Sequence, residues 1–209
     1  MTKVDLKKSI AAYTAPRGTF EIVEVPPMRY LMVDGHGDPN TSQEYGAAVA
    51  AVFGTAYKLK FLSKNELGRD YVVMPLEGLW WADDLASFTS ERDKSRWSWT
   101  MMSLVPEWID DDHFERAVAA AAERGATPAL HGLRLAELAE GQCVQTLHVG
   151  SYDDEGPVLA QMHDRFIPDA GLRPRGVHHE IYLADPRRTA PEKLRTILRQ
   201  PVEAVPAVP

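Results

Sequence analysis

The stretch GQCVQTLHVGSYDDEG, residues 141–156, decides the fold, because it predicts a strand that ends in a glycine-containing loop. Residues 141–150 are expected to form the strand and residues 151–156 the loop. Pro157 then suits the first turn of a helix, which we expect over residues 157–166. Further strands are expected at residues 176–183 and 192–199, although Pro191 could also open a helix over the last of these ranges. The second half therefore follows the order strand, loop, helix, strand, strand.

The first half repeats this order. A strand is expected at residues 29–33, a loop at 34–40, and a helix that runs to about residue 62. Thr41 with Glu44 three residues later has the pattern of a capping box at the start of that helix. Strands are expected at residues 70–76 and 95–105, with residues 79–82 as an extension of the first. The remaining expected elements are a helix at 4–13, a strand at 20–25 and a helix at 112–124.

This repetition predicts an α+β fold in which duplicated strand–helix–strand–strand units share an antiparallel sheet. We expect residues 1–209 to form a single domain, with halves at about residues 20–110 and 130–202. Helices would cover one face of the sheet. The other face would line a ligand cleft between the halves.

The bulk composition excludes several classes of protein. The net charge of −7 argues against a nucleic-acid partner, because phosphate binding needs clustered Lys and Arg. No stretch approaches the roughly 20 apolar residues of a membrane span, and the first nine residues do not resemble a secretory signal. Cys143 is the only cysteine, which rules out a disulfide within the chain. We expect a cytoplasmic protein with no membrane partner; its oligomeric state does not follow from the sequence.

The sequence HHEIYL, residues 178–183, places one carboxylate inside an apolar strand. Alternation puts His178, Glu180 and Tyr182 on one face of that strand. Glu180 could be a general base, a counter-ion for a cationic ligand or a residue that simply faces water. The choice among these three decides the function.

A cluster of tryptophans is the second candidate feature. Four of them fall within 20 residues, and adjacent Trp80 and Trp81 cannot both face the core of a strand. Large aromatic side chains usually fill cores. Exposed together, they would instead form a flat apolar surface that binds planar or cationic molecules. The candidate ligand-binding residues are Trp80, Trp81, Trp97, Trp99, Met101, His178 and Tyr182.

No metal or cofactor site is expected. The acidic runs Asp83-Asp84 and Asp110-Asp111-Asp112 suit turns and helix caps, with Asp112 placed just before a helix. The sequence has no paired cysteines and no histidines at the spacing of a zinc site. It also lacks a nucleotide-binding glycine loop and the setting of a serine nucleophile.

Several motifs together resemble the GyrI-like small-molecule-binding family. They are VPPM (25–28), VDGHGDPN (33–40), MPLEGLWW (74–81), HVGSYDDEG (148–156), HHEIYL (178–183) and KLRTILRQPV (193–202). The resemblance implies the duplicated fold and a cleft for hydrophobic, often cationic aromatic compounds. Stand-alone members similar to this chain are implicated as hydrolases that open cyclopropane rings in DNA-alkylating compounds.

The resemblance also implies roles for particular residues. Glu180 matches the cleft carboxylate of the family and would activate water. From the needs of that reaction, Tyr152 or Tyr182 could donate to the developing oxyanion or position the water. Two alternatives stay open. One is a non-catalytic sink or sensor for hydrophobic cationic aromatic drugs, and the other is a protein that protects DNA gyrase by contact with it.

Overall fold

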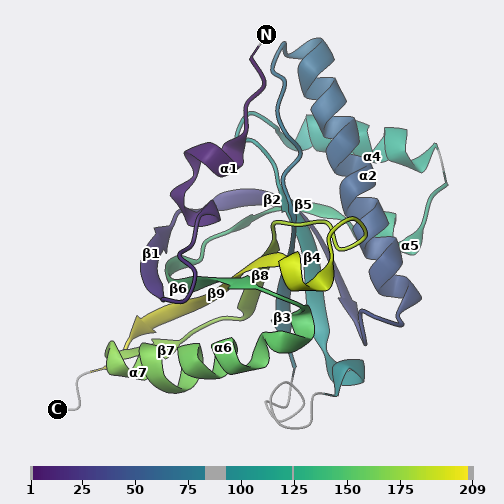
Figure 1. Cartoon of the computed structure of the whole chain (residues 1–209). Helices are drawn as coiled ribbons and strands as arrows, with labels where there is room; N and C mark the ends of the chain where they lie inside the picture. Colours follow the sequence, from purple (N-terminus) through teal and green to yellow (C-terminus); the bar gives the residue numbers. More distant parts are fainter. Residues whose placement is uncertain (1, 83–92, 124, 207–209) are drawn as a thin grey trace. The chain divides into compact units, whose positions relative to one another are not determined.

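The computed structural model describes residues 2–82, 93–123 and 125–206 (Figure 1). The chain folds into two compact units. Unit 1 comprises Met1–Ile10 and Met28–Leu138, and unit 2 comprises Ala11–Pro27 and Ala139–Pro209. Asp83 and Asp84, for which the sequence predicts a turn or a helix cap, lie outside the described residues.

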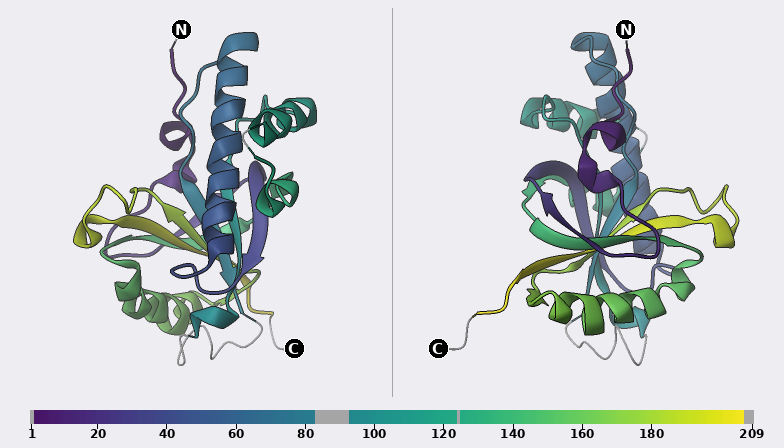
Figure 2. Two further views of the ribbon diagram at one scale, coloured as in Figure 1. Left: turned by 90° about the vertical axis from the view of Figure 1, so that its right-hand side faces the viewer. Right: turned by 60° about the vertical axis from the view of Figure 1, so that its left-hand side comes forward.

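Unit 1 contains an antiparallel sheet with strand order β3-β4-β2-β5. Its elements, in chain order, are α1 (Leu6–Ser9), β2 (Met28–His36), α2 (Gln43–Glu66), β3 (Leu76–Trp81), β4 (Ser98–Leu104), α4 (Asp111–Ala122), α5 (Pro128–His131) and β5 (Arg134–Leu138). The long helix α2 packs against β2 and β4, and α4 and α5 pack against α2 (Figure 2). The core of unit 1 therefore lies between α2 and the sheet.

The start of α2 differs from the expected one by a single residue. Ser42 is the N-cap, and its hydroxyl accepts from the backbone N–H of Tyr45 at 3.3 Å. Thr41 stands just outside the helix, so the predicted capping box from Thr41 to Glu44 is wrong. A similar shift occurs at α4, where the N-cap is Asp110 rather than Asp112, in a reciprocal capping box with His113.

Unit 2 has an antiparallel sheet with strand order β1-β6-β9-β8. Its strands are β1 (Glu21–Val25), β6 (Gly141–Val149), β8 (His178–Tyr182) and β9 (Arg195–Ala204), with β7 (Leu172–Pro174) beside the end of β9. The helical segment consists of α6 (Gly156–Gln161), a π-helical turn at Met162–Phe166 and α7 (Ile167–Asp169). Met162 and Ile167 pack with Val144, Leu198 and Val202, so this segment covers one face of the sheet.

The two units repeat one plan. In chain order, unit 1 runs β2, α2, β3, β4, and unit 2 runs β6, α6 to α7, β8, β9, with the short strand β7 added before β8. His36 ends β2 six residues before the N-cap Ser42, and Val149 ends β6 six residues before the N-cap Glu155. The α+β class, the duplicated order and the antiparallel pairing are therefore confirmed, while the cleft between the halves stays a prediction.

The fourth strand of each sheet comes from an unexpected place. β1 precedes β2 in sequence, yet it pairs with β6 in unit 2. β5 precedes β6, yet it pairs with β2 in unit 1. Unit 2 thus completes its sheet with the strand that precedes β2, and unit 1 completes its sheet with the strand that precedes β6. Neither unit is continuous in sequence.

Some predicted elements are wrong. A strand was expected at residues 70–76, but residues 70–75 make only an isolated bridge, between Tyr71 and Val4. β3 begins at Leu76, directly after Pro75, which has no N–H to donate to a ladder. The bridge at Val4 also shortens the expected helix over residues 4–13 to α1 and a separate 3₁₀ turn, Ala11–Tyr13. Residues 192–199 are mainly strand, preceded by a 3₁₀ turn at Pro191–Lys193. The elements α5, β5 and β7 were not predicted from the sequence.

None of the helices in the described ranges combines the length and the apolar composition that crossing a bilayer would require.

Candidate functional site

Glu180 lies in the middle of β8 and is largely buried. Its side chain is 13% exposed, and its Oε2 atom accepts a hydrogen bond of 2.7 Å from the hydroxyl of Tyr182. Alternate residues of a strand lie on the same face, so the contact between Glu180 and Tyr182 follows from their i, i+2 spacing. The structure therefore does not place Glu180 on the open surface, which was the simplest of the three interpretations.

His178 stands on the other side of the same carboxylate. Its Nε2 atom lies 3.6 Å from Oε1 of Glu180, which is beyond hydrogen-bonding distance but within reach of a small side-chain rotation. The imidazole is 7% exposed, and neither ring nitrogen has a hydrogen-bond partner within the described part of the chain. Alternation along HHEIYL thus brings His178, Glu180 and Tyr182 together, as predicted from the sequence.

Tyr152 joins this group from the loop after β6. Its ring lies edge-on to that of Tyr182, with centroids 5.5 Å apart. Burial raises the pKa of Tyr152 to about 12, and the negative charges of Glu155, Glu180 and Asp185 act in the same direction. The phenol therefore stays protonated at neutral pH and can donate a hydrogen bond. The loop itself is held by a hydrogen bond of 2.7 Å from the Ser151 hydroxyl to Asp154.

His163 completes the cluster, and it was not predicted from the sequence. Its ring centroid is 6.4 Å from that of His178, and it belongs to the π-helical turn Met162–Phe166. Burial lowers the pKa of His163 to about 4, with a further contribution from the charge of His178. Single π-helical turns often mark functional sites, but nothing in the spacing of residues 157–169 predicts one.

This cluster occupies the helix-bearing side of the unit 2 sheet. Glu180 lies opposite Leu198, and Leu198 packs with Met162 and Ile167 of the helical segment. We expected the candidate residues on the face without helices. That expectation is wrong for Glu180, because Glu180 shares a face of the sheet with Leu198 and the helical segment packs on that face.

The four predicted tryptophans and Met101 belong to unit 1, where three of these five residues are core. Trp99 and Met101 are fully buried, and the indole of Trp99 donates to the carbonyl of Gly37 at 3.2 Å. Trp80 is 5% exposed. Tyr45 of α2 contacts both indoles, with its ring centroid 6.3 Å from that of Trp80 and 5.4 Å from that of Trp99. Trp80 and Trp99 thus help join α2 to the sheet.

Trp81 and Trp97 remain half-buried. Trp81 points to the opposite face of β3 from Trp80, as expected for adjacent residues of a strand. The ring of Trp97 meets that of Trp80 at a centroid distance of 5.9 Å, and the ammonium of Lys94 lies 5.8 Å from the Trp97 ring centroid. These two indoles are the better candidates for ligand contact.

Other buried carboxylates, among them Glu77 and Glu140, were not singled out from the sequence. Glu77 on β3 is fully buried. Glu140, 3% exposed, binds both His179 and Arg199 at 2.9 Å. Burial opposes ionisation of Glu140, but these two partners outweigh it and hold its pKa well below its usual range. The same signal that singled out Glu180, an acidic residue in an apolar stretch, was present at Glu77.

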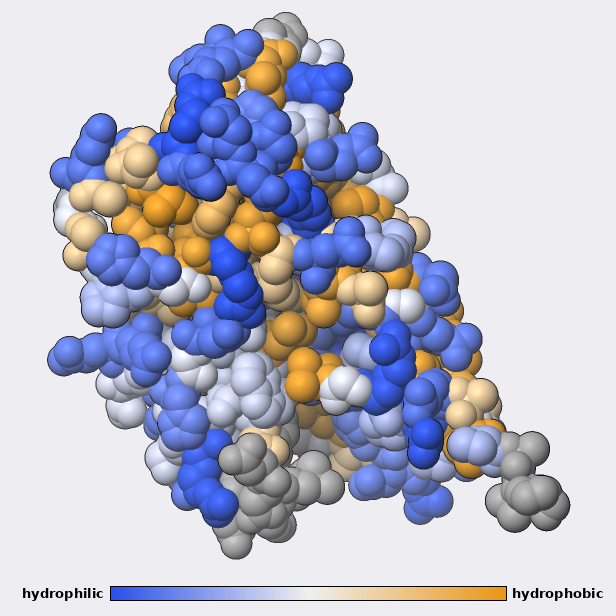
Figure 3. Space-filling model, turned by 180° about the vertical axis from the view of Figure 1, so that it is seen from behind, coloured by the Kyte–Doolittle hydropathy of each residue, from blue (hydrophilic) through white to orange (hydrophobic). Residues whose placement is uncertain are grey.

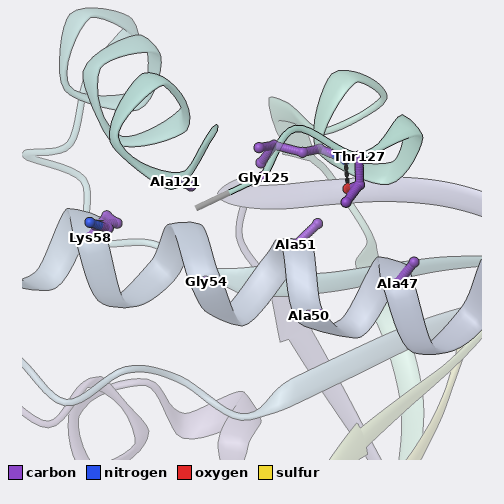
Figure 4. A pocket seen from close by; sticks show the side chains of 9 residues that line it. Ala47, Ala50, Ala51, Gly54, Lys58, Ala121, Gly125 and Thr127 are labelled. Carbon is purple, nitrogen blue, oxygen red and sulfur yellow. Dashed lines mark hydrogen bonds between the residues drawn. The ribbon is translucent and has the colours of Figure 1, made fainter. Parts of the chain in front are cut away.

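A separate hollow of about 230 Å³ lies in unit 1 between α2 and the α4–α5 region (Figure 4). Small residues of α2 form one wall, and Lys58, Ala121, Gly125, Thr127 and Leu130 line the rest. Seen from behind, hydrophobic side chains gather among charged ones over the region of α4 and α5 (Figure 3). None of the predicted site residues lines this hollow.

Residues 18–203 match the GyrI-like small molecule binding domain, which is most of the chain. The chain therefore belongs to the GyrI-like family and is a small-molecule-binding protein.

Solved structures give more particular relatives. An uncharacterized conserved protein from Listeria innocua is 38% identical, with a TM-score of 0.85 over 96% of this chain and 100% of that one. A protein described as a hydrolase from the same organism is 37% identical, with a TM-score of 0.82 over 96% of this chain and 100% of the other. Among curated proteins, none matches this chain.

Proposed function

We propose that this protein is a hydrolase that opens cyclopropane rings in electrophilic aromatic compounds, with Glu180 as the base that activates water. The observation that carries the proposal is the Glu180 carboxylate, largely buried and bonded to the Tyr182 hydroxyl at 2.7 Å. The description of a relative at 37% identity as a hydrolase supports turnover over binding alone.

The reaction needs few parts. A cyclopropane conjugated to a dienone is already strained and electrophilic. The oxygen of water bonds to a ring carbon, the ring C–C bond breaks, and its electron pair moves to the carbonyl oxygen, which becomes a phenolate. Glu180 receives the proton that the water loses. General-base catalysis typically contributes about 10²–10⁴-fold, and orientation of the substrate adds to it.

Tyrosines 152 and 182 take different tasks. Because the Tyr182 hydroxyl donates to Glu180, it fixes the carboxylate with one oxygen toward His178. Tyr152, held protonated by burial, is then the donor proposed for the developing oxyanion. Trp81 and Trp97 are proposed to contact the flat ring system of the substrate. No resident metal or cofactor enters this scheme, and the cytoplasm, where such alkylating compounds reach DNA, is the proposed place of action.

Binding without chemistry is the second candidate. A largely buried carboxylate attracts a cation more strongly than an exposed one, so the same Glu180 suits a sink for cationic aromatic drugs. Turnover separates the two functions. With a cyclopropane-bearing dienone in tenfold excess, a hydrolase forms product well beyond one equivalent, and Glu180→Gln stops it. Product that ends at one equivalent in the parent protein contradicts the hydrolase proposal and favours the sink.

A further inference from the structure

Two imidazoles, the buried one of His178 and the half-buried one of His163, lie near Glu180 without an evident structural role. His178 is 7% exposed, and neither of its ring nitrogens has a hydrogen-bond partner within the described residues. Buried polar side chains nearly always have such partners, so an imidazole without one calls for an explanation. The core of unit 2 does not supply it, because an apolar side chain of similar size would fill the same space without the cost of burying two polar atoms.

The surroundings of His178 give a direction. On one side, its Nε2 atom is 3.6 Å from Oε1 of Glu180. On the other side, its ring faces His163, with centroids 6.4 Å apart and ring planes at 60°. Because Tyr182 occupies the Oε2 atom of Glu180, Oε1 is the oxygen that faces His178. The three side chains therefore lie in the order Glu180, His178, His163, with His163 on the helical segment.

His163 is the member of this series that reaches the outside. It is half-buried and sits in the π-helical turn Met162–Phe166, next to the exposed residue Asp164. A general base that has taken a proton must lose it before the next turnover. A carboxylic acid that is 13% exposed and bonded to a tyrosine exchanges with water less readily than a free one.

We propose that His178 and His163 form a relay that carries the proton from Glu180 to solvent after water has been activated. This inference rests on the proposed function. The proton on Oε1 of Glu180 moves to Nε2 of His178, which becomes an imidazolium while the carboxylate is restored. The imidazolium passes a proton through His163 to solvent, and the phenolate product takes one proton from solvent. No net proton is consumed, and both histidines act through Glu180, so both are positioning residues.

The test compares single and double substitutions under substrate excess. His178→Asn keeps a polar side chain of smaller size, and we expect kcat to fall about 10- to 100-fold with KM changed less than twofold. His163→Asn should lower kcat in the same sense. Because the two act in series, the double variant should be no slower than His178→Asn alone, whereas independent effects would multiply. His131→Asn, an exposed histidine on α5 in unit 1, is the matched control.

Chemical rescue separates a relay from a structural role. Added imidazole should restore a substantial part of kcat to His178→Asn, while it should leave Glu180→Gln inactive. A His178→Asn protein with parental kcat, or one whose lower kcat follows only a lower melting temperature and does not respond to imidazole, overturns the relay alone. A parent protein that never exceeds one equivalent of product overturns the proposed function and the relay together.

Discussion

Glu180 occupies, in unit 2, the position in the strand register that Gly78 occupies in unit 1. In unit 1, Trp80 of β3 pairs with Trp99 of β4, and Trp99 pairs with Gly35, which is one residue before the end of β2. In unit 2, Tyr182 of β8 pairs with Thr196 of β9, and Thr196 pairs with His148, which is one residue before the end of β6. Gly78 and Glu180 each precede these aromatic residues by two. A Cβ atom on Gly78 would stand 2.7 Å from Nε1 of Trp80, so the indole fills the space that the carboxylate uses in unit 2.

The packing of Trp99 against Gly35 predicts that any larger residue at position 35 destabilises the protein. A Cβ atom there would stand 2.0 Å from the Trp99 ring. Gly35→Ala should therefore destabilise the protein by about 1–3 kcal/mol, as overpacking does. Gly54→Ala, in helix α2 with open space around it, should instead stabilise by up to about 1 kcal/mol. Urea unfolding of both variants checks the contrast, and equal effects would contradict it.

The buried network around Glu140 predicts a large loss on neutralisation. Glu140→Gln removes the charge that both Arg199 and His179 bind at 2.9 Å. Breaking a buried ion pair from one side costs about 3–5 kcal/mol. Glu66→Gln, which breaks an exposed pair with Arg116, is the control and should cost far less, because solvent screens exposed charges. The free energies of unfolding from denaturant titration decide the matter.

His163 predicts how stability depends on pH. Its pKa is about 4 in the folded protein against an ordinary value of 6.5, so between these values the unfolded chain binds a proton that the folded chain does not. Stability is then fully present above about pH 6.5 and falls as the pH drops toward 4, by at most about 3 kcal/mol. Glu140 acts in the same sense, but only below its usual pKa of 4.5. His163→Leu should reduce the loss of stability between about pH 6.5 and pH 4, while His131→Asn should leave that loss unchanged.

The two adjacent tryptophans should respond differently to truncation. Trp80 is 5% exposed beneath Tyr45, so Trp80→Ala should cost about 3–5 kcal/mol of stability. Trp81 is half-buried on the opposite face of β3, and Trp81→Ala should mainly raise KM with little change in kcat. Unfolding curves and steady-state kinetics on the same two proteins test this division. A strong loss of kcat in a well-folded Trp81→Ala protein would argue against it.

Ligand charge gives a test that needs no turnover. Glu180→Gln should weaken binding of a planar aromatic cation more than binding of a neutral analogue of the same shape, because only the cation gains from the carboxylate. Quenching of tryptophan fluorescence measures both affinities. Equal losses for the two ligands would show that Glu180 acts through shape instead of charge.

The sequence predicted the cluster on β8 because strand alternation is local. The spacing of His178, Glu180 and Tyr182 is enough to place them on one face, and the structure agrees. The helix α2 and the repeated strand order were predicted for the same reason, since periodicity and caps depend on near neighbours.

What the sequence could not predict depends on residues far apart in the chain. His163, whose ring centroid lies 6.4 Å from that of His178, belongs to a π-helical turn that no local sequence pattern predicts. The core role of Trp99 likewise depends on Tyr45 of a distant helix. The exchanged strands β1 and β5 lie beside partners that no hairpin turn could bring to them.

That exchange of strands has a consequence for synthesis. β1 leaves the ribosome before the other strands of unit 2, yet its partner β6 follows more than a hundred residues later, as the pair Glu21 and Gln145 shows. The sheet of unit 1 can close once residue 138 has emerged, because all four of its strands precede that point. Unit 2 must wait for its last strand, β9, while β1 stays without a partner. Folding on the ribosome should therefore proceed in two stages, and β1 finds its partner only in the second.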